Sequence, residues 1–261
     1  MQEFLKQIIR EAGFIAKGYY DVGVDFEEKG DPTDIVTKAD REVSNFLIEK
    51  IREKYPDHGI ISEEEPDEIN AGAEYTWVMD PIDGTRNFAN RIAMWCTMIG
   101  ITKNGKPYMG AVYNAINDEL FFAEAGQGAY LNDKKIYASE VDDLKSFSLS
   151  FSAGQIRGNK EYDVPKDLLN KYLDFYNNLL KDDGHWVSNW STALTFCYVA
   201  DGRLDAHVMC GGLYHDYLAP YIICREAGVL FTDSEGNDWQ RGRKDVVVAN
   251  PKLHKKLLEL F

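Results

Sequence analysis

The chain has 261 residues, of which 44% are hydrophobic and 13% aromatic, and 43 acidic against 29 basic residues give a net charge of −14. This composition is sufficient to bury a full core, so a disordered or low-complexity protein is excluded. The length is that of one large domain or two fused smaller ones. Because so acidic a surface repels phosphate backbones and anionic membranes, neither nucleic acid nor a membrane is an expected partner.

The first helix is expected at residues 4–20, where apolar residues recur at helical spacing. Charges run throughout this segment, so it is not predicted to be a signal peptide, and no apolar run in the chain reaches the ~18 residues of a membrane span. The cysteines lie among apolar residues with no C-x-x-C pair, which favours buried reduced thiols. These features predict a cytoplasmic protein. The four cysteines are Cys96, Cys197, Cys210 and Cys224.

A loop is predicted at residues 21–34, followed by a second helix that Thr37 can cap and that ends at Tyr55. Two short apolar runs come next, at 58–62 and 75–80, and each leads into acidic residues, which is typical of buried strands with carboxylates at their ends. From Trp95 to Tyr137, alternating segments separated by Asn-Gly and other glycine turns predict an antiparallel meander.

Beyond Lys145 strands and helices alternate. The pattern therefore predicts an α+β half at residues 1–142 and an α/β half at residues 143–261, within one structural unit. The expected strands of the second half are 146–152, 204–209, 229–233 and 245–250, and the expected helices are 165–180, 190–202, 216–228 and 251–260.

Acidic residues interrupt or follow the apolar segments at four places. A buried carboxylate without a partner is costly, so acids in such positions are candidate functional groups. The four segments are 34–40, 62–65, 80–85 and 215–216.

The third of these segments offers both metal ligands and an anion site. Pro81 holds Asp80 at the strand end and Asp83 starts a tight turn, so the two carboxylates can face one cation with the Ile82 carbonyl between them. Mg²⁺ prefers such oxygen ligands. The backbone N–H groups of Gly84 and Thr85 open an expected helix and would point at an anion.

The segment from Trp77 to Phe88 resembles the first signature of the inositol monophosphatase family. Three further segments resemble this family in the same order: 34–40 its D-x-V-T-x-x-D motif, 60–64 its strand followed by Glu-Glu, and 215–228 its second signature, W-D-x-A-x ahead of E-A-G. The resemblance implies a layered αβαβα sandwich. It also implies a Mg²⁺-dependent, Li⁺-sensitive phosphatase, often a homodimer, that hydrolyses a small phosphate monoester of a polyol, sugar or inositol by direct attack of water.

The same resemblance implies a role for each matching residue, and cations would relieve the repulsion among carboxylates that share one cleft. Asp40 would hydrogen-bond Thr85, whose hydroxyl would position the attacking water. The implied metal ligands, for two or three Mg²⁺ ions, are Glu63, Asp80, the Ile82 carbonyl, Asp83 and Asp216. Most of them lie in the half at residues 1–142, whereas the half at residues 143–261 would carry Asp216 and much of the substrate pocket. The implied catalytic residues are Thr85, Asp40, Glu63 and Glu64, and the implied substrate-binding residues are Gly84, Thr85, Asp83, Thr192, Met209 and Asp216.

The sequence departs from the family pattern where the alcohol half of the substrate would bind. Residues 190–194 read W-S-T-A-L where the family has G-S-A-A-L, and Met209 stands where inositol-hydrolysing members carry a Glu that binds a sugar hydroxyl. His215 replaces the Trp before the metal-binding Asp. Because Met cannot accept a hydrogen bond as a carboxylate does, we expect a preferred substrate other than myo-inositol 1-phosphate.

Two alternatives stay open. One is a nucleotide phosphatase of the 3′-phosphoadenosine 5′-phosphate type, in which Trp190 would stack on the base. The other is a catalytically idle regulatory or scaffold member of the family.

Overall fold

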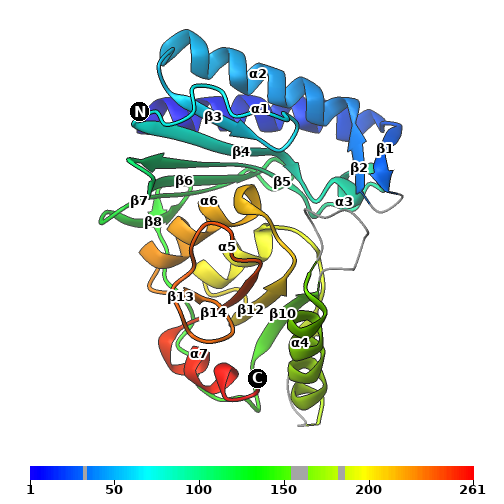
Figure 1. Cartoon of the computed structure of the whole chain (residues 1–261), viewed down its shortest axis with the longest axis vertical. Helices are drawn as coiled ribbons and strands as arrows, with labels where there is room; N and C mark the ends of the chain where they lie inside the picture. Colours follow the sequence, from blue (N-terminus) through cyan, green and yellow to red (C-terminus); the bar gives the residue numbers. More distant parts are fainter. Residues whose placement is uncertain (32–33, 154–163, 182–185) are drawn as a thin grey trace. The chain divides into compact units, whose positions relative to one another are not determined.

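The computed structural model divides the chain into two compact units (Figure 1). The first unit contains residues 1–135 together with two later segments, Thr192–Leu194 and His215–Ile223, and the second contains the rest. Asp216, although late in the sequence, thereby belongs to the first unit. The structure describes residues 1–31, 34–153, 164–181 and 186–261, and of residues 28–31 and 34–36 only the backbone.

A seven-stranded sheet with the order β3-β4-β5-β6-β7-β8-β9 forms the centre of the first unit. β3 and β4 are parallel, and every other neighbouring pair is antiparallel, which confirms the predicted meander. Asn104 and Gly105 both have positive φ, as a two-residue turn between β5 and β6 requires. The strands are β3 Gly59–Ser62, β4 Tyr75–Asp83, β5 Cys96–Lys103, β6 Lys106–Asn114, β7 Glu119–Glu124, β8 Gly128–Leu131 and β9 Lys134–Lys135.

Helices cover both faces of this sheet. α1 (Gln2–Val22) and α2 (Lys38–Lys54) pack on one face, where Ala111 and Tyr113 of β6 join their apolar core. Gly110 points to the other face, against the Ala219 carbonyl of α6 (Tyr214–Glu226). The alternation along β6 thus assigns each neighbouring helix to its own side of the sheet.

The start of α2 confirms the predicted cap at Thr37. The Thr37 hydroxyl accepts from the Ala39 N–H at 3.1 Å and donates to Asp40 Oδ2 at 2.6 Å, while Asp40 Oδ2 also accepts from the Thr37 N–H at 2.8 Å. This reciprocal arrangement satisfies backbone donors that the first helical turn leaves unpaired. The predicted loop at residues 21–34 is partly wrong, because β1 (Phe26–Asp31) pairs antiparallel with β2 (Asp34–Thr37). The glycine and proline in this segment favoured a loop in the prediction.

The second unit is built on a five-stranded sheet with the order β11-β10-β12-β14-β13. One face packs on α4 (Lys166–Leu179) and α7 (Pro251–Leu258), and on the other Phe196 of α5 (Leu194–Ala200) meets His207 edge to face. The expected helix at 190–202 begins four residues late, because Ser191 has a φ of 48°. The strands are β10 Ser148–Ala153, β11 Trp186–Ser188, β12 Ala206–Cys210, β13 Leu230–Thr232 and β14 Asp245–Ala249.

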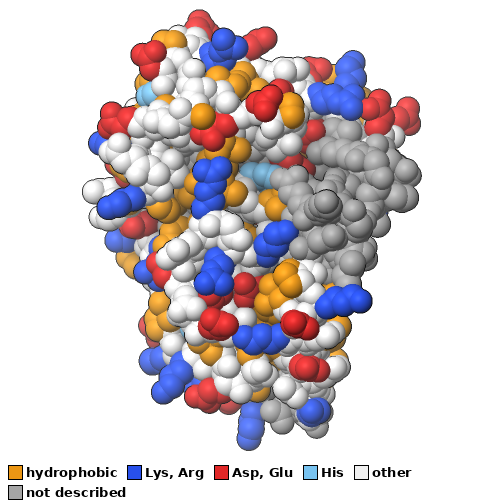
Figure 2. Space-filling model, in the orientation of Figure 1, with side chains coloured by type: hydrophobic (Ala, Val, Ile, Leu, Met, Phe, Trp, Pro, Cys, Tyr) orange, Lys and Arg blue, Asp and Glu red, His pale blue; other side chains and the backbone are white. Residues whose placement is uncertain are grey.

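Mixed sheets flanked by helices confirm the predicted α+β fold. All four cysteines are buried thiols outside any disulfide, as expected. Acidic and basic side chains are interspersed on the face drawn in Figure 2, so the acidic excess forms no continuous patch on its visible surface. Within the described ranges, no helix combines the length and the apolar character that crossing a bilayer demands.

Candidate metal centre

A β-bulge at the end of β4 places two carboxylates on one face of the sheet. Asp80 pairs with Met98 and Asp83 with Cys96, so three steps along β4 oppose only two along β5. Residues two apart share a face, and the extra residue therefore brings Asp83 to the side that Asp80 occupies. Pro81 suits this position because a bulge leaves a backbone N–H without a ladder partner.

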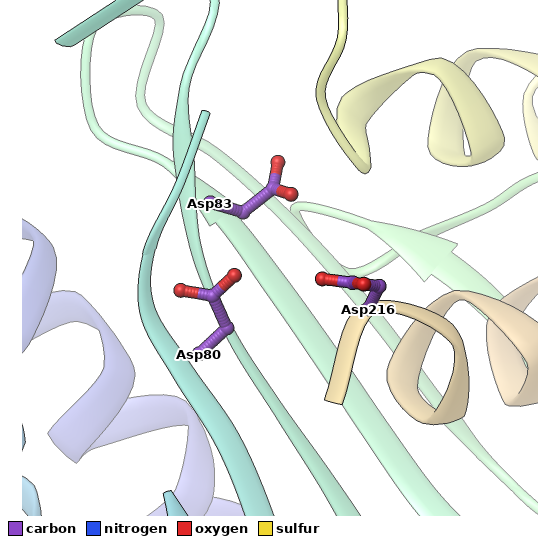
Figure 3. A group of neighbouring side chains, drawn as sticks. All are labelled: Asp80, Asp83 and Asp216. Atoms are coloured by element: carbon purple, nitrogen blue, oxygen red, sulfur yellow. The ribbon is translucent and has the colours of Figure 1, made fainter. Parts of the chain in front are cut away.

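The third carboxylate comes from the first turn of α6. Glycines on β5 and β6 let this helix lie against the sheet: a Cβ on Gly110 would lie 2.6 Å from the Ala219 carbonyl oxygen. Asp80, Asp83 and Asp216 then each offer an oxygen, and these oxygens lie within 4.8 Å of one another. Figure 3 shows the three side chains converging from the strand and from the helix. Of the metal ligands expected from the sequence, these three form one compact group.

Hydrogen bonds within the segment fix its shape. The Ile82 N–H donates to Asp80 Oδ1 at 3.0 Å, and the Thr97 hydroxyl donates to the Pro81 carbonyl at 2.8 Å. The Thr85 hydroxyl donates to the Ile82 carbonyl at 3.1 Å. The expected hydrogen bond between Thr85 and Asp40 is not among the hydrogen bonds of the described residues, because the carboxylate of Asp40 accepts from Thr37 instead.

The surrounding protein raises the pKa of the carboxyl groups in this cluster. Burial raises the pKa of Asp80 well above 3.8, and the negative charges of Glu63, Asp83 and Asp216 raise it further. Burial also raises the pKa of Asp83 to about 7, although the hydrogen bond from Thr192 opposes this shift. Like charges held together in a desolvated place bind either protons or a cation.

The other predicted acids lie near members of this group or near one another. Glu63 follows β3, and its backbone N–H donates to the Met79 carbonyl at 3.1 Å. Asp40 is 1% exposed, and burial together with the charge of Glu64 raises its pKa to about 7. His215 Nε2 lies 3.6 Å from Asp216 Oδ1, which is consistent with a role beside this carboxylate.

Two residues predicted to bind substrate belong to different units of the structure. Thr192 belongs to the first unit and donates its hydroxyl to Asp83 Oδ2 at 2.5 Å. Met209 lies on β12 of the second unit, paired with Ser152 and Val246. Gly84, with a φ of 83°, precedes the short helix α3 (Thr85–Ala89), in agreement with the expected helix start.

The sequence motifs gave no indication of the neighbours that support Asp83 from other elements. The Cys96 thiol lies 3.5 Å from Asp83 Oδ2, and the Ala193 N–H donates to the same oxygen at 2.6 Å. The position of Cys96 at the start of the strand that follows the acidic turn could have indicated this residue. No local signal links Asp83 to a residue 110 positions later.

Comparisons with known proteins agree with this geometry. The family model described as the inositol monophosphatase family matches residues 1–261. Inositol-1-monophosphatase of Bacillus subtilis is 32% identical over 263 residues, covering 100% of this chain and 96% of that protein. Nus factor SuhB of Pasteurella multocida is 35% identical over 259 residues, covering 95% and 91%.

A solved structure is similar over nearly the whole chain as well. The extragenic suppressor protein suhB from Bartonella henselae superposes with a TM-score of 0.89 at 28% sequence identity, covering 99% of this chain and 97% of that one. Fold, acidic cluster and sequence similarity thus lead to one assignment: the chain belongs to the inositol monophosphatase family.

Proposed function

We propose that the protein is a Mg²⁺-dependent phosphatase that hydrolyses a small phosphate monoester of a polyol, sugar or inositol. The observation that carries this proposal is the convergence of Asp80, Asp83 and Asp216 within 4.8 Å. Their ligand atoms are all carboxylate oxygens, which suit a hard cation such as Mg²⁺. The raised pKa of Asp80 supports a cation as well, because a positive charge would relieve the repulsion around it.

Glu63, Asp80, the Ile82 carbonyl, Asp83 and Asp216 would hold two or three Mg²⁺ ions. Bound Mg²⁺ lowers the pKa of a coordinated water and stabilises the charge on the leaving oxygen. The backbone N–H groups of Gly84 and Thr85 would bind the phosphate oxygens and orient the ester. Phosphoryl transfer depends mainly on such positioning and charge neutralisation, so these residues suffice without a covalent intermediate.

The alcohol half of the substrate is expected to differ from myo-inositol. Met209 lacks the carboxylate that would accept a hydrogen bond from a ring hydroxyl, and the loss of such a contact costs about 1–3 kcal/mol. We also expect a cytoplasmic homodimer that is inhibited by Li⁺, since the family resemblance implies these properties.

A panel of phosphate esters tests the proposal. Purified protein should release phosphate from at least one ester with Mg²⁺ present, and EDTA should abolish the release. The panel includes polyol phosphates, sugar phosphates, inositol phosphates and adenine-bearing esters, which also test the nucleotide alternative. Absence of Mg²⁺-dependent release across the whole panel would refute the proposal.

A second candidate function is a regulatory or scaffold role without turnover. The specific observation in its favour is the 35% identity to a protein named as a Nus factor. A protein that lacks turnover with every ester, yet retains partner binding after Asp80→Asn, would favour this candidate.

A further inference from the structure

One oxygen of Asp83 is saturated by hydrogen-bond donors. Asp83 Oδ2 accepts from the Thr192 hydroxyl at 2.5 Å, from the Ala193 N–H at 2.6 Å and from the Cys96 thiol at 3.5 Å. Among the residues that the structure describes, none donates a hydrogen bond to Oδ1 of this carboxylate. The two oxygens of Asp83 are therefore in different environments.

The donors reach Asp83 from two elements that the fold fixes separately. Cys96 opens β5 and pairs with Asp83 across the β-bulge. Thr192 lies 109 residues after Asp83 in the chain, next to the start of α5. The bond is thus a product of tertiary packing and not of local chain geometry.

Gly84 lies next to the threonine. Its φ of 83° favours glycine, and a Cβ there would lie 2.9 Å from the Met94 carbonyl oxygen and in ordinary contact, at 3.5 Å, with the Thr192 Cβ. Thr192 is 7% exposed, so water competes little for its hydroxyl.

We propose that Thr192 and Cys96 are positioning residues for Asp83: they commit Oδ2 to hydrogen bonds and leave Oδ1 as the oxygen that ligates Mg²⁺. This inference rests on the proposed function, because it requires that Asp83 is a metal ligand. It reassigns Thr192 from the substrate to the metal ligand. Partners that orient a metal ligand typically contribute 10–100-fold to metal affinity. The thiol contributes less than the hydroxyl, because it is a weak donor at a longer distance.

Calorimetric titration of the metal-free protein with Mg²⁺ tests the inference. Thr192→Val keeps the size of the side chain and removes its donor, so the Kd for Mg²⁺ should rise 10–100-fold. Thr192→Ser keeps the donor and should restore a Kd close to that of wild type. Thr102→Val is the matched control: Thr102 is a buried threonine at the other end of β5, and its substitution should leave the Kd unchanged.

Thermal unfolding of each metal-free variant accompanies the titration, so that a general loss of structure is recognised. Equal Kd values for Thr192→Val and wild type would overturn the inference while leaving the proposed function intact. Equal weakening in the Val and Ser variants would overturn it too, because the hydroxyl would not be the cause. Wild type without measurable Mg²⁺ binding would refute the proposed function itself, and this inference with it.

Cys96 is tested in the same assay. Cys96→Ala should raise the Kd about two- to five-fold, and Cys96→Ser, which retains a donor, should not. An unchanged Kd in Cys96→Ala would remove the thiol from the inference.

Discussion

Two buried carboxylates of the first unit and two buried histidines of the second differ in how well their neighbours satisfy them. In the first, burial and neighbouring acids raise the pKa of Asp80 and Asp83, so each carboxylate is made less stable by its surroundings. In the second, His207 Nδ1 lies 3.0 Å from the Ser150 carbonyl and His254 Nε2 lies 2.8 Å from the Thr232 hydroxyl. Burial lowers the pKa of both histidines to about 4, so both are neutral near pH 7 and bonded to neutral groups.

This difference separates structural from functional polar burial. A buried histidine whose neighbours hydrogen-bond its neutral form adds to stability and needs no proton or bound ion. A buried group of carboxylates is relieved only by protons or by a cation, which is typical of functional sites. Substitutions should therefore cost function in the first case and stability in the second.

The largest expected effect is that of Asp83→Asn, which removes one charge and keeps the shape of the side chain. Turnover with Mg²⁺ should fall about a thousand-fold or more, because the metal supplies several kcal/mol of transition-state stabilisation. The melting temperature in EDTA should stay equal or rise, because one repelling charge is gone. Initial rates and thermal unfolding measure the two effects, and retained turnover would contradict the role of Asp83.

The second prediction concerns His207 and pH. Its folded-state pKa of about 4 lies below its ordinary value of 6.5, so the unfolded chain takes up the proton first as the pH falls. The contribution of His207 is complete above pH 6.5 and is lost between pH 6.5 and 4, by about 3 kcal/mol at most. His207→Asn should remove this part of the pH dependence in denaturant titrations with EDTA. An identical pH dependence of the unfolding free energy in variant and wild type would contradict this role of His207.

Gly110→Ala tests how firmly α6 is seated on the sheet of the first unit. The new Cβ would lie 2.6 Å from the Ala219 backbone oxygen, so the helix has to shift, at about 1–3 kcal/mol of stability. Mg²⁺ affinity should fall as well, because α6 carries Asp216. The control is Gly18→Ala on α1, where a Cβ meets nothing within 4 Å and should stabilise by up to about 1 kcal/mol. Equal stability of the two variants would show that the contact tolerates a methyl group.

The smallest expected effect is a pH dependence of the stabilisation that Mg²⁺ gives to the protein. In metal-free protein the folded-state pKa of Asp83 is about 7 against an ordinary 3.8, so its contribution to stability falls as the pH rises between these values. Mg²⁺ replaces the lost proton, and it should raise the melting temperature more at pH 8 than at pH 6, by about 2–4 °C. Scanning calorimetry at both pH values measures the difference, and a larger shift at pH 6 would argue against carboxylate ligands.

Local patterns in the sequence predict much of this molecule. Thr37 caps α2 as expected, because the capping residues lie within three positions of each other. The two-residue turn at Asn104 and the amphipathic helix α1 follow equally from short-range rules. The proximity of Asp80 and Asp83 is local as well, since only Pro81 and Ile82 separate them.

Features that depend on tertiary packing could not be predicted in this way. The partner of Asp83 is Thr192, and no periodicity connects two positions 109 residues apart. In place of the expected bond between Thr85 and Asp40, Thr85 donates to the Ile82 carbonyl and Asp40 accepts from Thr37. The late start of α5 at Leu194 depends on tertiary packing as well. The backbone before the helix is irregular, and the Ala193 N–H donates a hydrogen bond to Asp83.

The β-bulge makes the path of the backbone at this point as important as the identity of its residues. Without the bulge, the three steps from Asp80 to Asp83 would follow regular alternation along β4, and the side chain of Asp83 would then turn to the opposite surface of the sheet. A change that straightened this stretch would therefore dismantle the acidic group without altering a single acid.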